Sequence, residues 1–183
     1  MKKLIITAIL LVISSSLFAQ EKNKESFPKN ELKINMSNLI AFKWVDISYE
    51  RILNEESTFG VGTLFSLDPE VNGIDEYRTF SVTPYYRHFF SNKYAQGFFV
   101  EAFGMIHSGK IENYIYTDFP PYETIITEDT YTDFAVGISV GAKFVTKRGF
   151  IAEIYAGIGR DLLNNSDIEV VGRGGVSIGY RFK

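Results

Sequence analysis

The sequence predicts an all-β protein, an eight-stranded antiparallel up-and-down transmembrane β-barrel with short periplasmic turns and longer external loops. Three observations support this fold class. The apolar residues alternate with a period of two, the alternating runs are long, and the connections between runs alternate in length. A tilted membrane strand needs about 9–11 residues, whereas strands in soluble sheets average about 5–6.

The clearest alternating run covers residues 133–145. Its apolar face is formed by Phe134, Val136, Ile138, Val140, Ala142 and Phe144. The same periodicity predicts strands over 31–40, 44–53, 57–67, 77–90, 97–108, 131–146, 149–161 and 168–182. After the N-terminal segment, no stretch reaches the roughly 18 continuous apolar residues of a membrane helix.

The predicted connections sort by length. After a tight first turn near Phe42, the joins are short at 54–56, 91–96 and 147–148, long at 68–76 and 109–130, and intermediate at 162–167. Outer-membrane barrels place short turns on the periplasmic side and longer loops outside. A soluble β-sandwich has no reason to sort its loops by side.

Residues 1–19 have the three-part pattern of a secretory signal peptide. Lys2 and Lys3 precede an apolar run over 4–13, and small and apolar residues lead to Ala19. The apolar run is too short to cross a bilayer as a helix. We therefore expect export by the general secretory route, a flexible periplasmic lead-in over 20–30, and a barrel over 31–183.

The composition excludes several functions. A formal charge of -3 without a long basic run argues against nucleic-acid binding. The absence of cysteine excludes disulfides, a thiolate nucleophile and Cys-ligated zinc. No GxGxxG, P-loop, HExxH or EF-hand pattern is present, so we expect neither a cofactor nor a metal site.

Residue parity divides the strands into an apolar face and a charged face. The predicted outer face includes Val45, Ile47, Tyr49, Phe98, Val100, Ala102, Ile154, Ala156, Ile158, Val176, Ile178, Tyr180 and Phe182. A soluble barrel would turn this apolar face inward. A secreted soluble β-barrel that carries an apolar ligand is therefore the inverted alternative. Strand length and loop sorting favour the membrane orientation.

Six charged residues of the inner face fall in the periplasmic half of the predicted barrel. They are Glu50, Arg87, Glu101, Lys143, Glu153 and Arg181. Unpaired buried charge costs several kcal/mol, so we predict that these three carboxylates and three cations form an ion-pair network that plugs the lower lumen. Because side chains fill eight-stranded barrels, we expect no open pore. A proton or ion path is the alternative.

His107 is the candidate for catalysis, with Ser108, Tyr131 and Asp133 near it in the predicted barrel. These residue types would suit a hydrolase or acyltransferase that modifies outer-leaflet lipid. However, neighbouring residues of a strand point to opposite faces, which is poor geometry for activation of Ser108 by His107. A histidine hydrogen-bonded inside the barrel rim is the expected alternative.

The predicted loop over 109–130 is acidic and rich in aromatic residues. Its binding candidates are Tyr114, Tyr116, Asp118, Phe119 and Tyr122. Such a rim could bind an external protein or a divalent cation that bridges lipopolysaccharide. A loop that charge keeps solvated is the simpler interpretation.

The C-terminal segment 176–183 resembles the terminal strand of Gram-negative outer-membrane barrels, with Tyr180 and Phe182 as the assembly signal for the barrel-assembly machinery. Further segments at 38–41, 47–50, 84–87, 97–101 and 172–175 resemble an uncharacterised family of small outer-membrane β-barrel proteins. The resemblance covers residues 31–182. It implies an eight-stranded barrel and an outer-membrane location, and it supplies no catalytic residues. In that location we expect outer-membrane lipid and lipopolysaccharide as partners.

The leading hypothesis is therefore a non-enzymatic, integral outer-membrane barrel with a structural or surface-interaction role and no open pore. A lipid-modifying enzyme that uses His107 and a soluble carrier barrel remain the alternatives.

Overall fold

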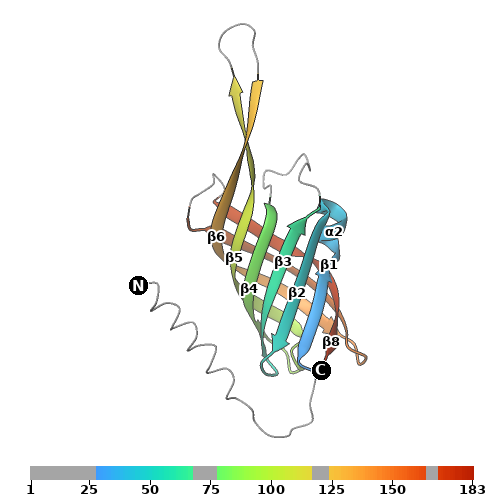
Figure 1. The fold of residues 1–183 in the computed structure, drawn as a ribbon. Helices are drawn as coiled ribbons and strands as arrows, with labels where there is room; N and C mark the ends of the chain where they lie inside the picture. The colour runs from blue at the N-terminus through green and yellow to red at the C-terminus, as the bar shows by residue number, and fades with distance from the viewer. Residues whose placement is uncertain (1–27, 68–77, 117–123, 164–168) are drawn as a thin grey trace, which may run out of the picture.

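A computed structural model describes residues 28–67, 78–116, 124–163 and 169–183 of the chain. Within these ranges the chain forms a closed antiparallel barrel of eight strands with one short helix (Figure 1). The elements are β1 (Asn30–Asn35), α2 (Met36–Phe42), β2 (Trp44–Ile52), β3 (Ser57–Ser66), β4 (Arg78–Phe89), β5 (Gly97–Tyr116), β6 (Thr124–Val145), β7 (Phe150–Asp161) and β8 (Val170–Phe182). The predicted eight-stranded antiparallel up-and-down barrel is confirmed.

Each strand pairs with its neighbours in sequence, and β1 closes the barrel against β8. This closing seam runs from Asn30 opposite Phe182 to Asn35 opposite Ser177. Because every strand has two neighbours, the barrel leaves no free sheet edge along the paired region. Up-and-down order places the connections 53–56, 90–96 and 146–149 at one end, together with the C-terminus (Figure 1). We name this the turn end, and the opposite end the loop end.

The first strand is shorter than predicted. Strand β1 ends at Asn35, and α2 occupies residues that the period-two pattern assigned to the strand over 31–40. Asn35 caps the helix, since its side chain accepts a hydrogen bond from the backbone N–H of Asn38. Lys43 ends the helix in the left-handed conformation (φ 54°). The predicted tight turn near Phe42 is thus a helical turn.

The predicted long loop over 109–130 is also wrong. Strands β5 and β6 continue as a pair as far as Tyr116 opposite Thr124. Pairing of β5 with β4 ends at Gly109, and pairing of β6 with β7 begins at Ala135. The continuation is therefore a two-stranded ribbon that projects beyond the loop end (Figure 1). Its connection, 117–123, lies outside the described residues.

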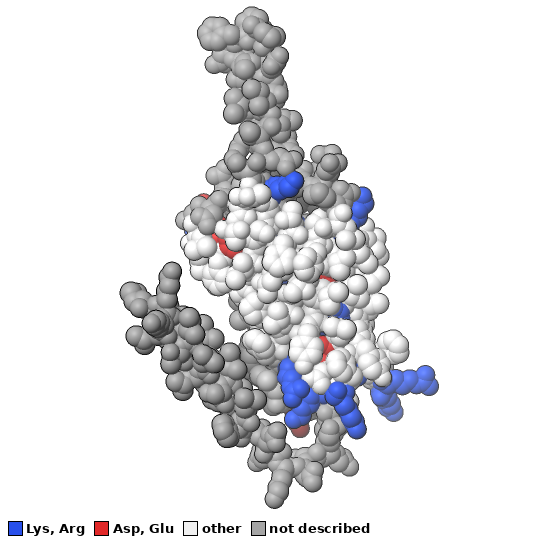
Figure 2. Space-filling model, viewed as in Figure 1, with Lys and Arg blue, Asp and Glu red and all other residues white. Residues whose placement is uncertain are grey.

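The outer surface of the barrel is apolar. Figure 2 shows uncharged side chains over the middle of the barrel and Lys and Arg side chains gathered at the turn end. Phe98, Ile138 and Ile158 are 75%, 61% and 60% exposed. The predicted outer-face residues point outward, so the inverted arrangement with an apolar lumen is wrong. Among the described residues, no helix is long and apolar enough to cross a membrane.

The predicted lead-in over 20–30 falls mostly on residues that are not described. Pro28 and Lys29 have no regular secondary structure, and β1 begins at Asn30 rather than at residue 31. The predicted signal peptide over 1–19 also lies outside the described residues.

Candidate functional site in the barrel lumen

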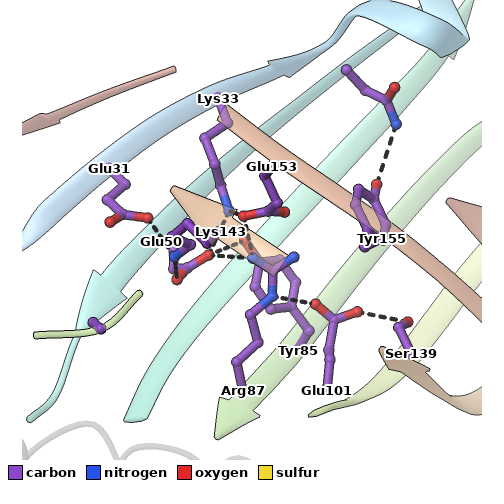
Figure 3. A network of polar contacts seen from close by, with 12 residues as sticks. Glu31, Lys33, Glu50, Tyr85, Arg87, Glu101, Ser139, Lys143, Glu153 and Tyr155 are labelled. Atoms are coloured by element: carbon purple, nitrogen blue, oxygen red, sulfur yellow. Dashed lines mark hydrogen bonds and ion pairs between the residues drawn. The ribbon is translucent and has the colours of Figure 1, made fainter. Parts of the chain in front are cut away.

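Inward-facing charged side chains fill the lumen near the turn end (Figure 3). We name this set the lumen network: Glu31, Lys33, Glu50, Arg87, Glu101, Lys143, Glu153, Arg173 and Arg181. Every strand except β3 contributes a member. Alternation along each strand turns these residues inward while their apolar neighbours face outward.

Glu50 lies at the centre of the network and meets three cations. Its Oε2 accepts hydrogen bonds from Lys33 Nζ at 2.6 Å and from Arg87 Nη1 at 3.0 Å, and its Oε1 accepts from Lys143. The hydroxyl of Tyr85 donates to the same carboxylate at 3.1 Å. The Glu50 carboxylate is fully buried, so these donors replace its hydration.

Arg87 joins the central carboxylate to the next ones. Its Nη1 lies 2.7 Å from Glu153 Oε2, and its Nε lies 2.5 Å from Glu101 Oε2. Lys33 also contacts Glu153, at 2.9 Å. Glu101 in turn accepts hydrogen bonds from Arg173 and, at 3.0 Å, from Ser139. One connected set of ion pairs therefore extends from Glu50 toward the loop end of the lumen.

A second branch reaches the turn end. Lys143 Nζ donates to Glu31 at 2.8 Å, and Arg181 Nε donates to the same carboxylate at 2.7 Å. Arg181 also donates to the backbone carbonyls of Tyr94 and Ala95, at 3.1 and 2.8 Å. Ala95 is fully buried with a φ of 43°. The 90–96 connection thus folds against the network from the turn end.

Aromatic rings surround the central guanidinium. The Cζ atom of Arg87 lies 4.6 Å from the ring centroid of Tyr85, 4.3 Å from that of Phe99 and 5.7 Å from that of Tyr155. Cation–π attraction of this kind is strongest where the cation is desolvated. Glycine makes room for one of these rings, because a Cβ at Gly60 of β3 would overlap Tyr85.

The network is arranged so that its buried charges neutralise one another. Each of its four carboxylates meets at least two of its five cations, which is the condition under which buried charge is tolerated. Its members are carboxylate, ammonium and guanidinium groups held by one another. Within the described residues, no group of three His, Cys, Asp or Glu side chains has the arrangement of a metal site.

All six residues of the sequence-predicted network come together in the structure. Sequence reasoning missed three further members: Glu31, Lys33 and Arg173. Glu31 and Lys33 are charged residues two apart on β1, on either side of the exposed Leu32. That alternation was the sequence signal that could have placed both residues on the inner face. Arg173 lies on the charged face of β8, but farther from the turn end than the predicted six.

Above the network the lumen holds a cavity of about 380 Å³. It is lined by residues of α2, by Trp44 and Asp46 of β2, and by Arg78 and Arg173. Asp46 accepts hydrogen bonds from the amides of Asn38 at 2.8 Å and Asn35 at 3.1 Å. The cavity forms here because β1 has ended and α2 takes its place between β2 and β8.

His107 is buried inside the barrel and pairs with an acid from another strand. Its Nε2 lies 2.8 Å from Asp161 Oδ1, and its ring contacts that of Tyr131 edge-on at 5.7 Å between centroids. Asp133 lies opposite His107 in the β5–β6 register. Ser108 is the next residue of the strand and points to the other face. The structure thus does not bring Ser108 and His107 together.

The external binding candidates lie on or beyond the ribbon. Tyr114 pairs with Ile126 and Tyr116 with Thr124 in the ribbon's backbone register. Asp118, Phe119 and Tyr122 lie outside the described residues. At the other end of the chain, Tyr180 and Phe182 are exposed on β8, and Phe182 lies opposite Asn30.

No protein-family model matches the chain, and no curated protein matches it significantly. A solved structure does. The chain is similar to the crystal structure of the N-terminal β-barrel domain of Pseudomonas aeruginosa OprF, with a TM-score of 0.54 and 13% sequence identity. The similarity covers 86% of this chain and 100% of the OprF domain. At this identity the similarity supports the fold alone.

Proposed function

We propose that the protein is a non-enzymatic, integral outer-membrane β-barrel of a Gram-negative bacterium, with a structural or surface-interaction role and no open pore. The observation that carries the proposal is the inside-out distribution of polarity. Ion pairs fill the interior, whereas large apolar side chains such as Phe98 and Ile158 stand exposed around the outside. A closed barrel satisfies its backbone hydrogen bonds internally, as a bilayer requires.

The packing of the network supports the proposal that the barrel has no open pore. Arg87, Lys143 and Glu50 are fully buried, and both cations pair with the Glu50 carboxylate inside the barrel. Conduction of an ion would require separation of these pairs, which costs several kcal/mol for each unpaired buried charge. The buried Ala95 adds a further barrier at the turn end. We therefore propose that the barrel does not conduct ions.

The ribbon formed by β5 and β6 is the part of the molecule best placed for surface interaction. It projects from the loop end, where it is paired only with itself beyond the barrel wall. In the proposed orientation it extends from the cell surface toward an external protein or lipopolysaccharide. The proposal includes two targeting signals. The signal peptide over 1–19 would direct export, and the exposed aromatic residues Tyr180 and Phe182 of β8 would be recognised by the barrel-assembly machinery.

Cell fractionation tests the location. The proposal predicts that the protein sediments with outer membranes, resists extraction with carbonate, and migrates faster on a gel before heating than after heating. Recovery of the protein from the soluble periplasm or the medium would contradict the proposal.

Single-cysteine labelling tests the orientation, and the absence of native cysteine makes each label unique. Thr130→Cys places an exposed thiol on the ribbon, and Asn92→Cys places one in the 90–96 connection. A membrane-impermeant maleimide should label the Thr130→Cys protein in intact cells and the Asn92→Cys protein only after lysis. The reverse pattern would mean that the turn end faces outward.

A further inference from the structure

The turn end carries exposed cations without acidic partners. They are Lys29, Arg51, Lys93, Lys147, Arg148 and Lys183, which we name the basic collar. None of them forms an ion pair with another described residue; Arg51 instead donates to the side chain of Asn30. The exposed acids nearby are Glu55 and Glu56 in the β2–β3 connection. Within the part of the chain that the structure describes, the collar is thus a surplus of positive charge without neutralising ion pairs.

The collar encircles the turn end. Arg51 is on β2, Lys93 is in the β4–β5 connection, and Lys147 and Arg148 are in the β6–β7 connection. Lys29 and Lys183 flank the seam where β1 meets β8. Even without Lys183, the other five cations outnumber the two exposed acids nearby among the described residues. Figure 2 shows Lys and Arg side chains gathered at the turn end on the face in view.

Exposed aromatic rings lie directly on the barrel side of the collar. They are Phe90, Phe98, Phe144, Phe150, Tyr180 and Phe182. The Phe150 and Tyr180 rings contact each other edge-on at 5.7 Å between centroids. Lys147 lies three residues from Phe144, and Arg148 lies two residues from Phe150, so each is within roughly 10 Å of a ring-bearing residue along the chain. Aromatic girdles mark the membrane interface, so the collar lies at headgroup depth.

We infer that the basic collar binds the anionic headgroups of glycerophospholipids in the leaflet at the turn end. This inference rests on the proposed function, in which that leaflet is the periplasmic one. Each cation near an anionic lipid surface contributes about five-fold to association. Lys and Arg stems are long enough to bring the charge to the phosphates while their methylene groups lie along the apolar belt.

The lipid annulus of the reconstituted protein tests the inference. We would fold the full chain into phosphatidylcholine vesicles with spin-labelled phosphatidylglycerol or phosphatidylcholine, and measure the association of each label by electron paramagnetic resonance. The parent should prefer phosphatidylglycerol, and 0.5 M salt should weaken the preference because screening shortens the Debye length. The double substitution Lys147→Gln/Arg148→Gln should reduce the preference by up to about five-fold per cation removed.

A charge-matched control separates the collar from net charge. Lys43→Gln/Arg160→Gln removes two exposed cations near the loop end and should leave the preference unchanged. The exchange Lys147→Arg/Arg148→Lys keeps the charge and should also keep the preference. Equal loss in both Gln pairs, or a parent without preference, would overturn the inference. Failure of the parent to insert into neutral phosphatidylcholine would instead contradict the proposed membrane location.

Discussion

At the scale of single residues, the lumen depends on the balance of buried charges. Glu50 is the clearest case, because three cations and the Tyr85 hydroxyl converge on its carboxylate. Replacement by glutamine keeps the shape of the side chain but removes the negative charge. The three cations that pair with Glu50 would then have one carboxylate partner fewer. The cost of burying their charges would be less well compensated.

We expect Glu50→Gln to lower the free energy of unfolding by about 3–5 kcal/mol. Urea titration of the protein in lipid vesicles, followed by the gel shift between folded and unfolded forms, measures this change. Glu56→Gln is the matched control, because Glu56 is exposed in the β2–β3 connection. Equal stability of the Glu50→Gln and Glu56→Gln proteins would show that the network does not stabilise the barrel.

Glycine at inward positions makes room for the rings of the lumen. A Cβ at Gly141 would overlap the ring of Phe99 and the backbone of Ile154. We expect Gly141→Val to destabilise the barrel by about 1–3 kcal/mol, as overpacking does elsewhere. Ala142→Val changes the next residue, which faces outward, and should have little effect in the same urea titration. Similar effects at the two positions would contradict the inward orientation of Gly141.

At the scale of elements, α2 depends on one side chain. The Asn35 side chain caps the helix and donates to Asp46, to the Tyr155 hydroxyl and to the carbonyl of Gly174. A single amide therefore joins β1, α2, β2, β7 and β8 near the point where the β1–β8 pairing ends.

We expect Asn35→Ala to lower the free energy of unfolding by about 1–2 kcal/mol and to expose residues 36–43 to protease. Limited proteolysis with mass spectrometry locates the cleavage. Asn54→Ala removes an asparagine that also accepts a backbone hydrogen bond, but at an exposed turn. The Asn54→Ala protein should resist cleavage at 36–43. Resistance of the Asn35→Ala protein as well would show that other contacts hold α2.

The ribbon should be dispensable for the barrel. Deletion of 111–126 leaves Thr127, Glu128 and Asp129 as a three-residue loop between Lys110 and Thr130, which already pair. Loops of this length are common in hairpins. We expect heat-modifiable folding with a urea midpoint close to that of the parent. Loss of folding would show that the ribbon takes part in barrel assembly.

The alternating pattern of the sequence predicted the barrel strands better than it predicted helix α2 and the ribbon, for a physical reason. Alternation along 133–145 indicates which side chains point outward and which point into the lumen, so the inner and outer faces of this strand could be predicted. Helix α2 occupies the end of a run that alternates with period two in the sequence. Its N-cap Asn35 and its Ser37 contact β8, which comes from the far end of the chain, so local sequence alone did not predict the helix. The segment 109–130 interrupts the apolar alternation with acidic residues and with Pro120-Pro121, and so its sequence predicts a loop. Glu31 and Lys33 were missed although their alternation indicated an inward face.

At the scale of the whole molecule, the near-zero mean hydropathy of -0.02 results from two opposite surfaces. The outside carries exposed rings and aliphatic chains, and the inside carries ion pairs. The two contributions cancel in an average over residues. A soluble barrel with the same composition would reverse the faces. The proposed membrane location therefore requires that the apolar outer face meets lipid.

Quenching by brominated phosphatidylcholine tests that claim most directly. Trp44 is the one tryptophan of the sequence, so the Trp44→Phe protein provides a background without tryptophan fluorescence. Ala102 and Phe103 are neighbours on β5, exposed and buried respectively. The account predicts strong quenching of Ala102→Trp and weak quenching of Phe103→Trp. Equal quenching at the two positions, or stronger quenching of Phe103→Trp, would contradict the account.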